Sequence, residues 1–183
     1  MTSPAISGEP PLGLRINRET LDAVIAHCRE EAPREGCGLL AGREGQGQGK
    51  RQGQGPEAGA ESGGEASVGG CGGEAAGIHT VNSSIRMTNT DRSERTYMMD
   101  PAEQFQAFKE MRKRKEDLVG IYHSHPASPA YPSPTDVRLA YYPDAVYLIV
   151  SLSGREPEAR AFRIRDERIT EIPIMIVDEM IIE

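Results

Sequence analysis

Residues 120–137, GIYHSHPASPAYPSPTDV, place two of the chain's four histidines one residue apart at the end of an apolar run, and a loop with four prolines follows. On a β-strand, residues i and i+2 face the same side. His123 and His125 are therefore expected to project together, with Ser124 turned away. Two imidazoles at this spacing can bind one metal ion, and zinc accepts nitrogen and oxygen ligands in tetrahedral geometry.

A catalytic zinc usually takes three protein ligands and keeps one position for water. Asp136 is the nearby candidate for the third ligand. The four prolines lower the entropy lost when the loop is ordered. We expect Ser133 to cap a short helix that begins at Pro134 and carries Asp136 in its first turn.

Each part of this pattern has an ordinary interpretation. An isolated His-x-His is more often structural or exposed than metal-binding, and Ser133 and Asp136 alone would be capping residues. The complete spacing, His-x-His, seven residues, Ser, two residues, Asp, rarely arises by chance. The HExxH motif of other zinc proteases and the HxE and PCxxC motifs of zinc deaminases are absent from the sequence.

Length and charge restrict the class of protein. A chain of 183 residues suits a single domain, and the net charge of -7 argues against general binding to nucleic acid or anionic membranes. No run of about 18 apolar residues occurs, and the N-terminus does not have the pattern of a signal peptide. Three cysteines without a CxxC pair fit a reducing compartment, so we expect a cytoplasmic protein.

Residues 43–77 contain 13 of the 20 glycines and one large aliphatic side chain, Val68. Such a stretch cannot bury enough apolar area to offset the entropy of ordering it. We therefore predict a flexible N-terminus over residues 1–13 and one domain over residues 14–183, interrupted by a disordered Gly-rich insertion at 43–77.

The hydrophobic pattern predicts helices between short strands. Asn17 can cap a helix with Leu21, Val24 and Cys28 on its apolar side, and Pro33 ends it. A second helix is expected after Asp100, with Pro101 first, Glu103 completing a capping box, and Phe105, Phe108 and Met111 forming one apolar side. Strands are predicted over residues 14–16, 37–42, 118–125, 146–152, 159–165 and 169–177, the last one interrupted by Pro173. Residues 78–88 are predicted to form a strand or a pair of strands, and residues 96–99 are expected to be extended as well. These elements indicate an α/β fold in which helices pack on a mixed sheet.

The motif of residues 123–136, together with Glu35 in REGCGLLAG (34–42), resembles the JAMM (MPN-plus) metalloprotease family over residues 14–165. The resemblance implies a mixed, mostly antiparallel sheet flanked by helices, as in cytidine deaminases. It also implies that His123, His125 and Asp136 hold Zn²⁺, which activates a water molecule. Glu35 would accept the water's proton and pass it to the leaving atom, and the Ser133 hydroxyl would help to stabilise the oxyanion. Without this motif, Glu35 would be interpreted as a surface carboxylate at a helix end.

The sequence is most similar to a bacterial branch of that family, over residues 85–104 and 130–151. That resemblance implies hydrolysis at the C-terminus of a ubiquitin-like sulfur-carrier protein that ends in Gly-Gly, with release of cysteine or a short extension. Two alternatives are a general isopeptidase that acts on other ubiquitin-like conjugates and a non-catalytic scaffold.

Two features of the chain bear on access to the site. An extended substrate tail can add to a strand edge. Asn89 is a candidate for the rim that receives the tail, although an ordinary polar strand end explains it equally well. Family members have a short connection in place of residues 43–77, which are either inert or part of the access route or of a partner surface.

Overall fold

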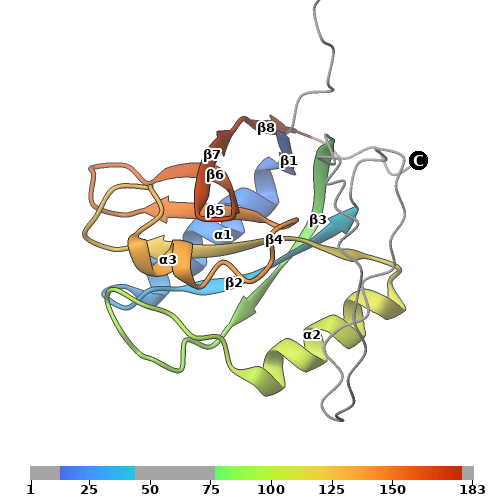
Figure 1. Ribbon diagram of the computed structural model, residues 1–183, viewed down its shortest axis with the longest axis horizontal. Coiled ribbons are helices and arrows are strands. Elements are labelled where there is room, and N and C mark those ends of the chain that lie inside the picture. Colours follow the sequence, from blue (N-terminus) through green and yellow to red (C-terminus); the bar gives the residue numbers. More distant parts are fainter. Residues whose placement is uncertain (1–12, 44–76, 179–183) are drawn as a thin grey trace, which may run out of the picture.

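The computed structural model describes residues 13–43 and 77–178, and it consists of one curved sheet with helices packed on it (Figure 1). The predictions for the N-terminus and the Gly-rich insertion lie outside the described residues, apart from the residues at their borders. Among the helices that are described, none combines the length and apolar character needed to cross a membrane.

The order of elements follows the hydrophobic pattern of the sequence closely. The elements are β1 (Gly13–Asn17), α1 (Arg18–Glu31), β2 (Cys37–Arg43), β3 (Ile78–Met87), α2 (Pro101–Lys113), β4 (Asp117–His125), α3 (Pro134–Arg138), β5 (Val146–Ser151), β6 (Glu158–Arg165), β7 (Arg168–Ile172) and β8 (Ile174–Val177).

The sheet has the strand order β7-β6-β5-β4-β2-β3-β1-β8. β2 pairs antiparallel with β3 and β4, and β6 pairs antiparallel with β5 and β7. β1 runs parallel to β3 and β8, and β4 runs parallel to β5. The prediction of a mixed, mostly antiparallel sheet with helices is confirmed.

The interruption that the sequence predicts at Pro173 within residues 169–177 is confirmed, but it separates two different strands and not two parts of one strand. Pro173 has no backbone N–H to contribute to a ladder, and the chain divides there into β7 and β8. β7 pairs with β6 at one end of the strand order, and β8 pairs with β1 at the other. Because a single residue joins these two edge strands, the sheet must curl until its edges approach. The Pro173 carbonyl accepts a hydrogen bond from the Leu14 amide at 3.0 Å across this junction.

Two apolar clusters lie on the two faces of the curled sheet. α1 contributes Leu21, Val24 and Cys28 to one cluster, together with the β1 side chains and Tyr122. α2 contributes Ala107 and Met111 to the other, which also contains Cys37 and Ile121. α1 therefore packs inside the curve of the sheet and α2 covers the outer face (Figure 1).

The apolar side predicted for α2 is partly wrong. Phe105 is 62% exposed, whereas Ala107 and Met111 are buried one helical turn apart. Asp100 caps the helix as expected, by accepting from the amides of Ala102 and Glu103. The Glu103 carboxylate does not complete a capping box, because it accepts instead from the backbone amide and hydroxyl of Thr88 on the neighbouring chain segment.

Residues 96–99, which are expected to be extended, do not form a strand of the sheet. Their only ladder contact among the described residues is one bridge between Met99 and Asn89. The segment belongs to an irregular loop, residues 88–99, between β3 and α2. Side-chain hydrogen bonds in this loop take the place of a strand ladder.

Gly38 lies opposite Tyr122 in the β2–β4 ladder, and the fully buried Tyr122 ring occupies the space next to it. The Tyr122 hydroxyl reaches Nδ1 of His27 on α1 at 2.8 Å. A Cβ atom at position 38 would overlap with the Tyr122 ring and with the Ile85 carbonyl oxygen. This close approach therefore requires glycine at position 38.

We predict that Gly38→Ala lowers the free energy of unfolding by roughly 2–3 kcal/mol, because the core must shift to admit the methyl group. Chemical denaturation would measure the change. Gly154→Ala is the matched control. A Cβ atom added at this exposed residue would lie 3.3 Å from its nearest neighbour, the Glu156 carbonyl oxygen. Equal stability of the two variants would contradict the packing argument.

Candidate metal centre

β4 ends in the two histidines, which face the same side of the strand as the sequence predicts. His123 is fully buried, and its Nε2 lies 3.1 Å from Nε2 of His125. The Asp136 carboxylate completes the group, with Oδ1 at 3.3 Å from Nε2 of His123 and Oδ2 at 3.4 Å from Nε2 of His125. The structure therefore brings Asp136 to two histidines that precede it in the sequence by 13 and 11 residues.

A reciprocal capping box at the start of α3 holds Asp136 in place. The Ser133 amide donates to Oδ2 of Asp136 at 2.6 Å, and the Asp136 amide donates to the Ser133 hydroxyl oxygen at 3.2 Å. Pro134 is the first helical residue, so the helix start predicted from SPTD is confirmed. The cap orients the carboxylate toward the histidines as well as starting the helix.

The spacing of the three donor groups fits a metal ion. Tetrahedral zinc with ligand bonds of 2.0–2.1 Å places its ligand atoms about 3.3–3.4 Å apart. The three distances observed here, 3.1, 3.3 and 3.4 Å, are close to that separation. Two imidazole nitrogens and one carboxylate are also a donor set that zinc accepts, and they leave a fourth position for water.

A hydrogen bond from the proline-rich loop sets the orientation of His125. Its Nδ1 lies 2.9 Å from the Pro129 carbonyl oxygen. A carbonyl oxygen can only accept, so Nδ1 carries the proton and the lone pair on Nε2 of the neutral ring faces the centre. The loop is held in turn by the Ser151 hydroxyl on β5, which donates to the Ser128 carbonyl at 2.7 Å.

Electrostatics favour a charged Asp136. Burial alone would raise the pKa of its carboxyl group, but hydrogen bonds with His123, His125 and Ser133 hold that pKa well below its usual range. Burial lowers the pKa of His123, against the opposing effect of Asp136. The pKa of His125 is raised, because Asp136 and the Pro129 carbonyl outweigh its burial.

Glu35 is buried beside this group, with 3% of its surface exposed, and is not a surface carboxylate. Burial raises its pKa to about 7, with His125 lowering it and Asp136 raising it further. Oε2 of Glu35 has no hydrogen-bond partner among the described residues. A carboxyl group with a pKa near neutrality can accept a proton and then return it at physiological pH.

The backbone next to Glu35 is tied to β4. The Gly36 amide donates to the Ser124 hydroxyl at 2.8 Å, and the Ser124 amide donates to the Gly36 carbonyl at 2.9 Å. Ser124 is the residue between the two histidines, and its side chain points away from them as expected. The same residue therefore links the candidate ligands to the peptide that follows Glu35.

Sequence reasoning missed Tyr97. Its ring stacks on the His123 ring, with centroids 4.6 Å apart and an interplanar angle of 27°. Burial raises the pKa of Tyr97 well above its ordinary value, with Asp136 and Glu35 contributing. No signal in the sequence pointed to this contact, because it joins an irregular loop to the end of a strand that is distant in the chain.

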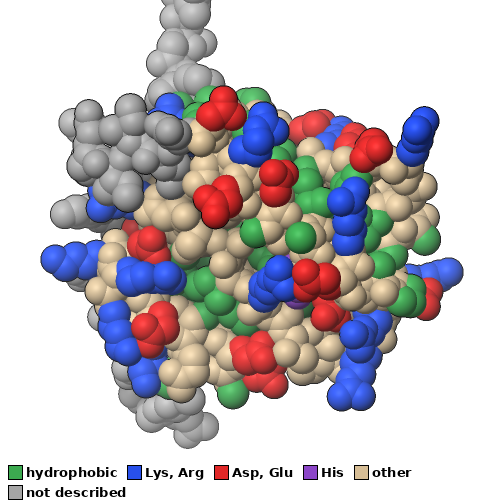
Figure 2. Space-filling view, turned by 180° about the vertical axis from the view of Figure 1, so that it is seen from behind, with side chains coloured by type: hydrophobic (Ala, Val, Ile, Leu, Met, Phe, Trp, Pro, Cys, Tyr) green, Lys and Arg blue, Asp and Glu red, His purple; other side chains and the backbone are tan. Residues whose placement is uncertain are grey.

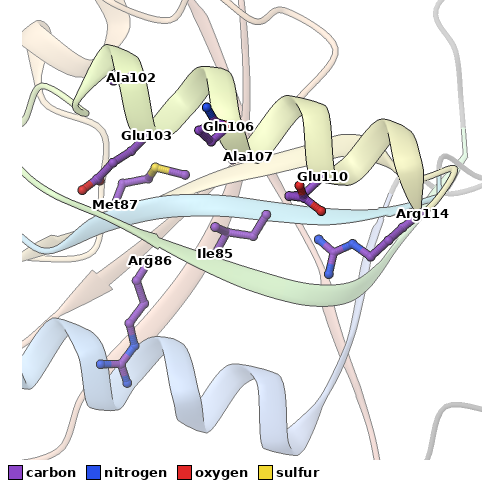
Figure 3. A pocket seen from close by; sticks show the side chains of 9 residues that line it. All are labelled: Ile85, Arg86, Met87, Ala102, Glu103, Gln106, Ala107, Glu110 and Arg114. Atoms are coloured by element: carbon purple, nitrogen blue, oxygen red, sulfur yellow. The ribbon is translucent and has the colours of Figure 1, made fainter.

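Two cavities among the described residues lie apart from the candidate ligands. A groove of about 610 Å³ runs between β3 and α2, with Ile85, Met87 and Ala107 on its apolar side (Figure 3). A polar cavity of about 290 Å³ adjoins it and is lined in part by His27, Asn89 and Arg92. Neither contains His123, His125, Asp136 or Glu35, so the chemistry and not cavity size identifies the site.

Three candidate ligand side chains around one point, with a buried carboxyl group beside them, have the donor set that a single-metal hydrolytic centre on a mixed α/β sheet would need. Residues 17–165 match the family described as prokaryotic homologs of the JAB domain. The chain belongs to this family, and the resemblance noted from the sequence is confirmed.

Individual proteins show the same likeness. The CysO-cysteine peptidase of Mycobacterium tuberculosis is 36% identical over 91% of this chain and 92% of its own length. A probable TtuB-protein conjugate cleaving protease of Thermus thermophilus is 31% identical over 78% of this chain and 73% of its own length. The solution structure of a Desulfitobacterium hafniense protein superposes with a TM-score of 0.70 at 31% identity, over 91% of this chain and 94% of that one.

We predict that Glu35 makes the metal-free protein less stable as the pH rises. Its pKa is raised from 4.5 to about 7, so between these values the unfolded chain loses the proton while the folded chain keeps it. At about 1.4 kcal/mol per unit, the loss is roughly 3 kcal/mol.

Chemical denaturation at pH 5 and pH 8 of the wild-type protein and the Glu35→Gln variant, both freed of metal with a chelator, would measure this loss. Wild type should lose more stability than the variant across the interval. Parallel pH dependence of the two proteins would show that Glu35 is not desolvated in solution.

Proposed function

We propose that this protein is a zinc-dependent hydrolase that cleaves the amide bond at the C-terminus of a ubiquitin-like sulfur-carrier protein, releasing cysteine or a short extension after Gly-Gly. The observation that carries the proposal is the grouping of His123, His125 and Asp136 beside the buried Glu35 carboxyl. The similarity to a CysO-cysteine peptidase along nearly the whole chain supports the substrate class.

His123, His125 and Asp136 would hold the zinc ion, since their donor atoms have the spacing of a tetrahedral site. When bound, zinc supplies Lewis acidity, which polarises the scissile carbonyl and makes water nucleophilic near neutral pH. The protein's own contribution is rigidity, because the Ser133 cap and the Pro129 carbonyl orient two of the three ligands before any ion arrives.

Glu35 would take the proton of the attacking water and deliver it to the amine that leaves. The reaction is balanced by one water molecule, whose hydroxyl joins the glycine carbonyl carbon and whose proton completes the free amine. A carboxyl group with a pKa of about 7 suits both steps, because accepting and releasing the proton are then similar in free energy.

Ser133 would donate its hydroxyl proton to the oxygen of the tetrahedral intermediate. Its oxygen accepts from the Asp136 amide, so the hydroxyl hydrogen is left available for a second partner. This role would add an electrostatic contribution to transition-state stabilisation.

The surface and the cysteines agree with a protein partner in the cytoplasm. Figure 2 shows one face of the molecule, on which acidic and basic side chains are interspersed without a broad basic patch. Cys28 and Cys37 are buried free thiols, in keeping with a reducing compartment.

A Gly-Gly tail suits a narrow approach to the metal, because glycine adds no side chain there.

A second candidate is a general isopeptidase that removes ubiquitin-like modifiers from proteins. The similarity to a probable TtuB-protein conjugate cleaving protease favours this alternative. Both reactions need the same centre, and they differ in whether a free amino acid or a protein lysine carries the leaving amine. A non-catalytic scaffold fits less well, because scaffold members of this fold lose metal ligands and this chain has a complete set.

We predict that the wild-type protein removes the terminal residue from a Gly-Gly-ended sulfur-carrier protein that carries a C-terminal cysteine. Intact-mass spectrometry should show the loss of one cysteine. Glu35→Gln should retain zinc but lower turnover by at least about 100-fold, because the proton acceptor is gone. His123→Ala should lose both zinc and activity.

Zinc content measured on each variant separates loss of metal from loss of chemistry. Unimpaired turnover by Glu35→Gln would rule out its role as the base. An intact carrier adduct after incubation with zinc-loaded wild type would instead favour the isopeptidase alternative, which a lysine-linked conjugate of the same carrier would test.

A further inference from the structure

The loop of residues 88–99 lies against the metal centre from the side of Glu35 and His123. It leaves β3 at Thr88 and enters α2 after Asp100, and it contains both Asn89 and Tyr97. Glu103 anchors its start from α2 by accepting from the amide and hydroxyl of Thr88. Figure 3 shows Glu103 extending from the first turn of α2 toward that end of β3.

Asn89 uses its whole side-chain amide inside the protein. Nδ2 donates to the Glu35 carbonyl at 2.9 Å and to the Thr96 carbonyl at 3.1 Å. Oδ1 accepts from the amides of Asp91 and Met98, each at 3.1 Å. Two donors and two acceptor positions are the full capacity of this side chain, which is only 6% exposed. The possibility that its side chain forms a rim for substrate is therefore not supported.

Glu35 depends on this loop for its position. The Glu35 amide donates to the Ser93 carbonyl at 2.8 Å, and the Glu35 carbonyl accepts from Asn89. Both backbone groups of Glu35 are thus bonded to the same loop. Oε2 of its carboxylate has no hydrogen-bond partner among the described residues, so the backbone and packing determine where that carboxylate points.

Tyr97 is held by the same amide. The Asn89 side chain forms hydrogen bonds with the residues on both sides of Tyr97, namely with the carbonyl of Thr96 and the amide of Met98. Tyr97 then stacks on His123. One side chain therefore fixes the backbone of the candidate base and the backbone of the ring that packs on a candidate metal ligand.

We propose that Asn89 is a positioning residue that sets Glu35 and Tyr97 relative to His123. This inference rests on the proposed function, because it takes Glu35 as the proton acceptor. Asn89 touches neither substrate nor metal in this role. It acts by keeping the base in place, because even a small displacement of the base would lower the reaction rate strongly.

The test uses the full-length chain with Asn89→Ala and Asn89→Asp. Asn89→Asp keeps the acceptor for Asp91 and Met98 but loses the donors to Glu35 and Thr96. Thr90→Ala is the matched control, because the exposed Thr90 hydroxyl donates to the Met98 carbonyl at 3.0 Å in the same loop without touching Glu35.

Both Asn89 variants should lower kcat on the carrier–cysteine adduct by about 100-fold, with KM and zinc content unchanged. Hydrogen exchange on the metal-free protein supplies a readout independent of activity. The Glu35 amide should exchange faster in the Asn89 variants than in wild type, whereas amides of β5 and all amides of the control should not change.

Wild-type kcat in the Asn89 variants would overturn the inference, as would unchanged exchange at Glu35 or a loss of zinc that parallels the loss of rate. Failure of both variants to fold would also overturn it, by showing a purely structural role. An active Glu35→Gln enzyme would refute the proposed base and the inference together. An inactive Glu35→Gln enzyme with active Asn89 variants would refute the inference alone.

Discussion

The antiparallel pairing of β2 with β4 is the interaction on which the rest of the site depends. Its register places Cys37 opposite His123 and Gly38 opposite Tyr122. The hydrogen bonds between Gly36 and Ser124 extend the contact past the end of β2, so Glu35 lies beside the histidines. A shift by one residue would turn the histidines into the opposite core, because side chains alternate along a strand. Gly38 resists such a shift, since it alone leaves room for the Tyr122 ring.

The two carboxyl groups of the site are buried in different ways, and the difference separates their chemistry. Asp136 is compensated by hydrogen bonds from the histidines and from the α3 cap, so it remains ionised. Glu35 lies in the same neighbourhood without comparable partners, and burial brings its pKa to about 7. An ionised carboxylate suits metal binding and a near-neutral one suits proton transfer. Under the proposed function, local environment would thus give two roles to one type of side chain.

Both faces of the sheet carry an apolar cluster, and the candidate ligands His123 and His125 project on the face opposite α1. The side with α1 holds a continuous apolar cluster, which the junction at Pro173 closes by joining β7 to β8. The other side carries α2, α3 and the loop of residues 88–99, all of which border the site or support its residues. The candidate ligands project from a strand end and a capped helix, and the loop bonds both backbone groups of Glu35, the proposed base.

The sequence by itself determined much of the fold and the candidate site. The strand periods, the Asn17 and Asp100 caps and the SPTD helix start are local features, so propensity and spacing reveal them. The spacing of His123, His125, Ser133 and Asp136 indicated a metal centre for the same reason, whereas Glu35 was singled out only through the resemblance to the JAMM family. What the tertiary structure alone decided are the contacts between distant segments: β7 and β8 at opposite edges, Phe105 exposed on α2, Glu103 bonded to Thr88, Tyr97 stacked on His123, and Asn89 turned inward to Glu35. These contacts depend on how the sheet curls and on where an irregular loop comes to lie, and neither leaves a periodic trace along the chain.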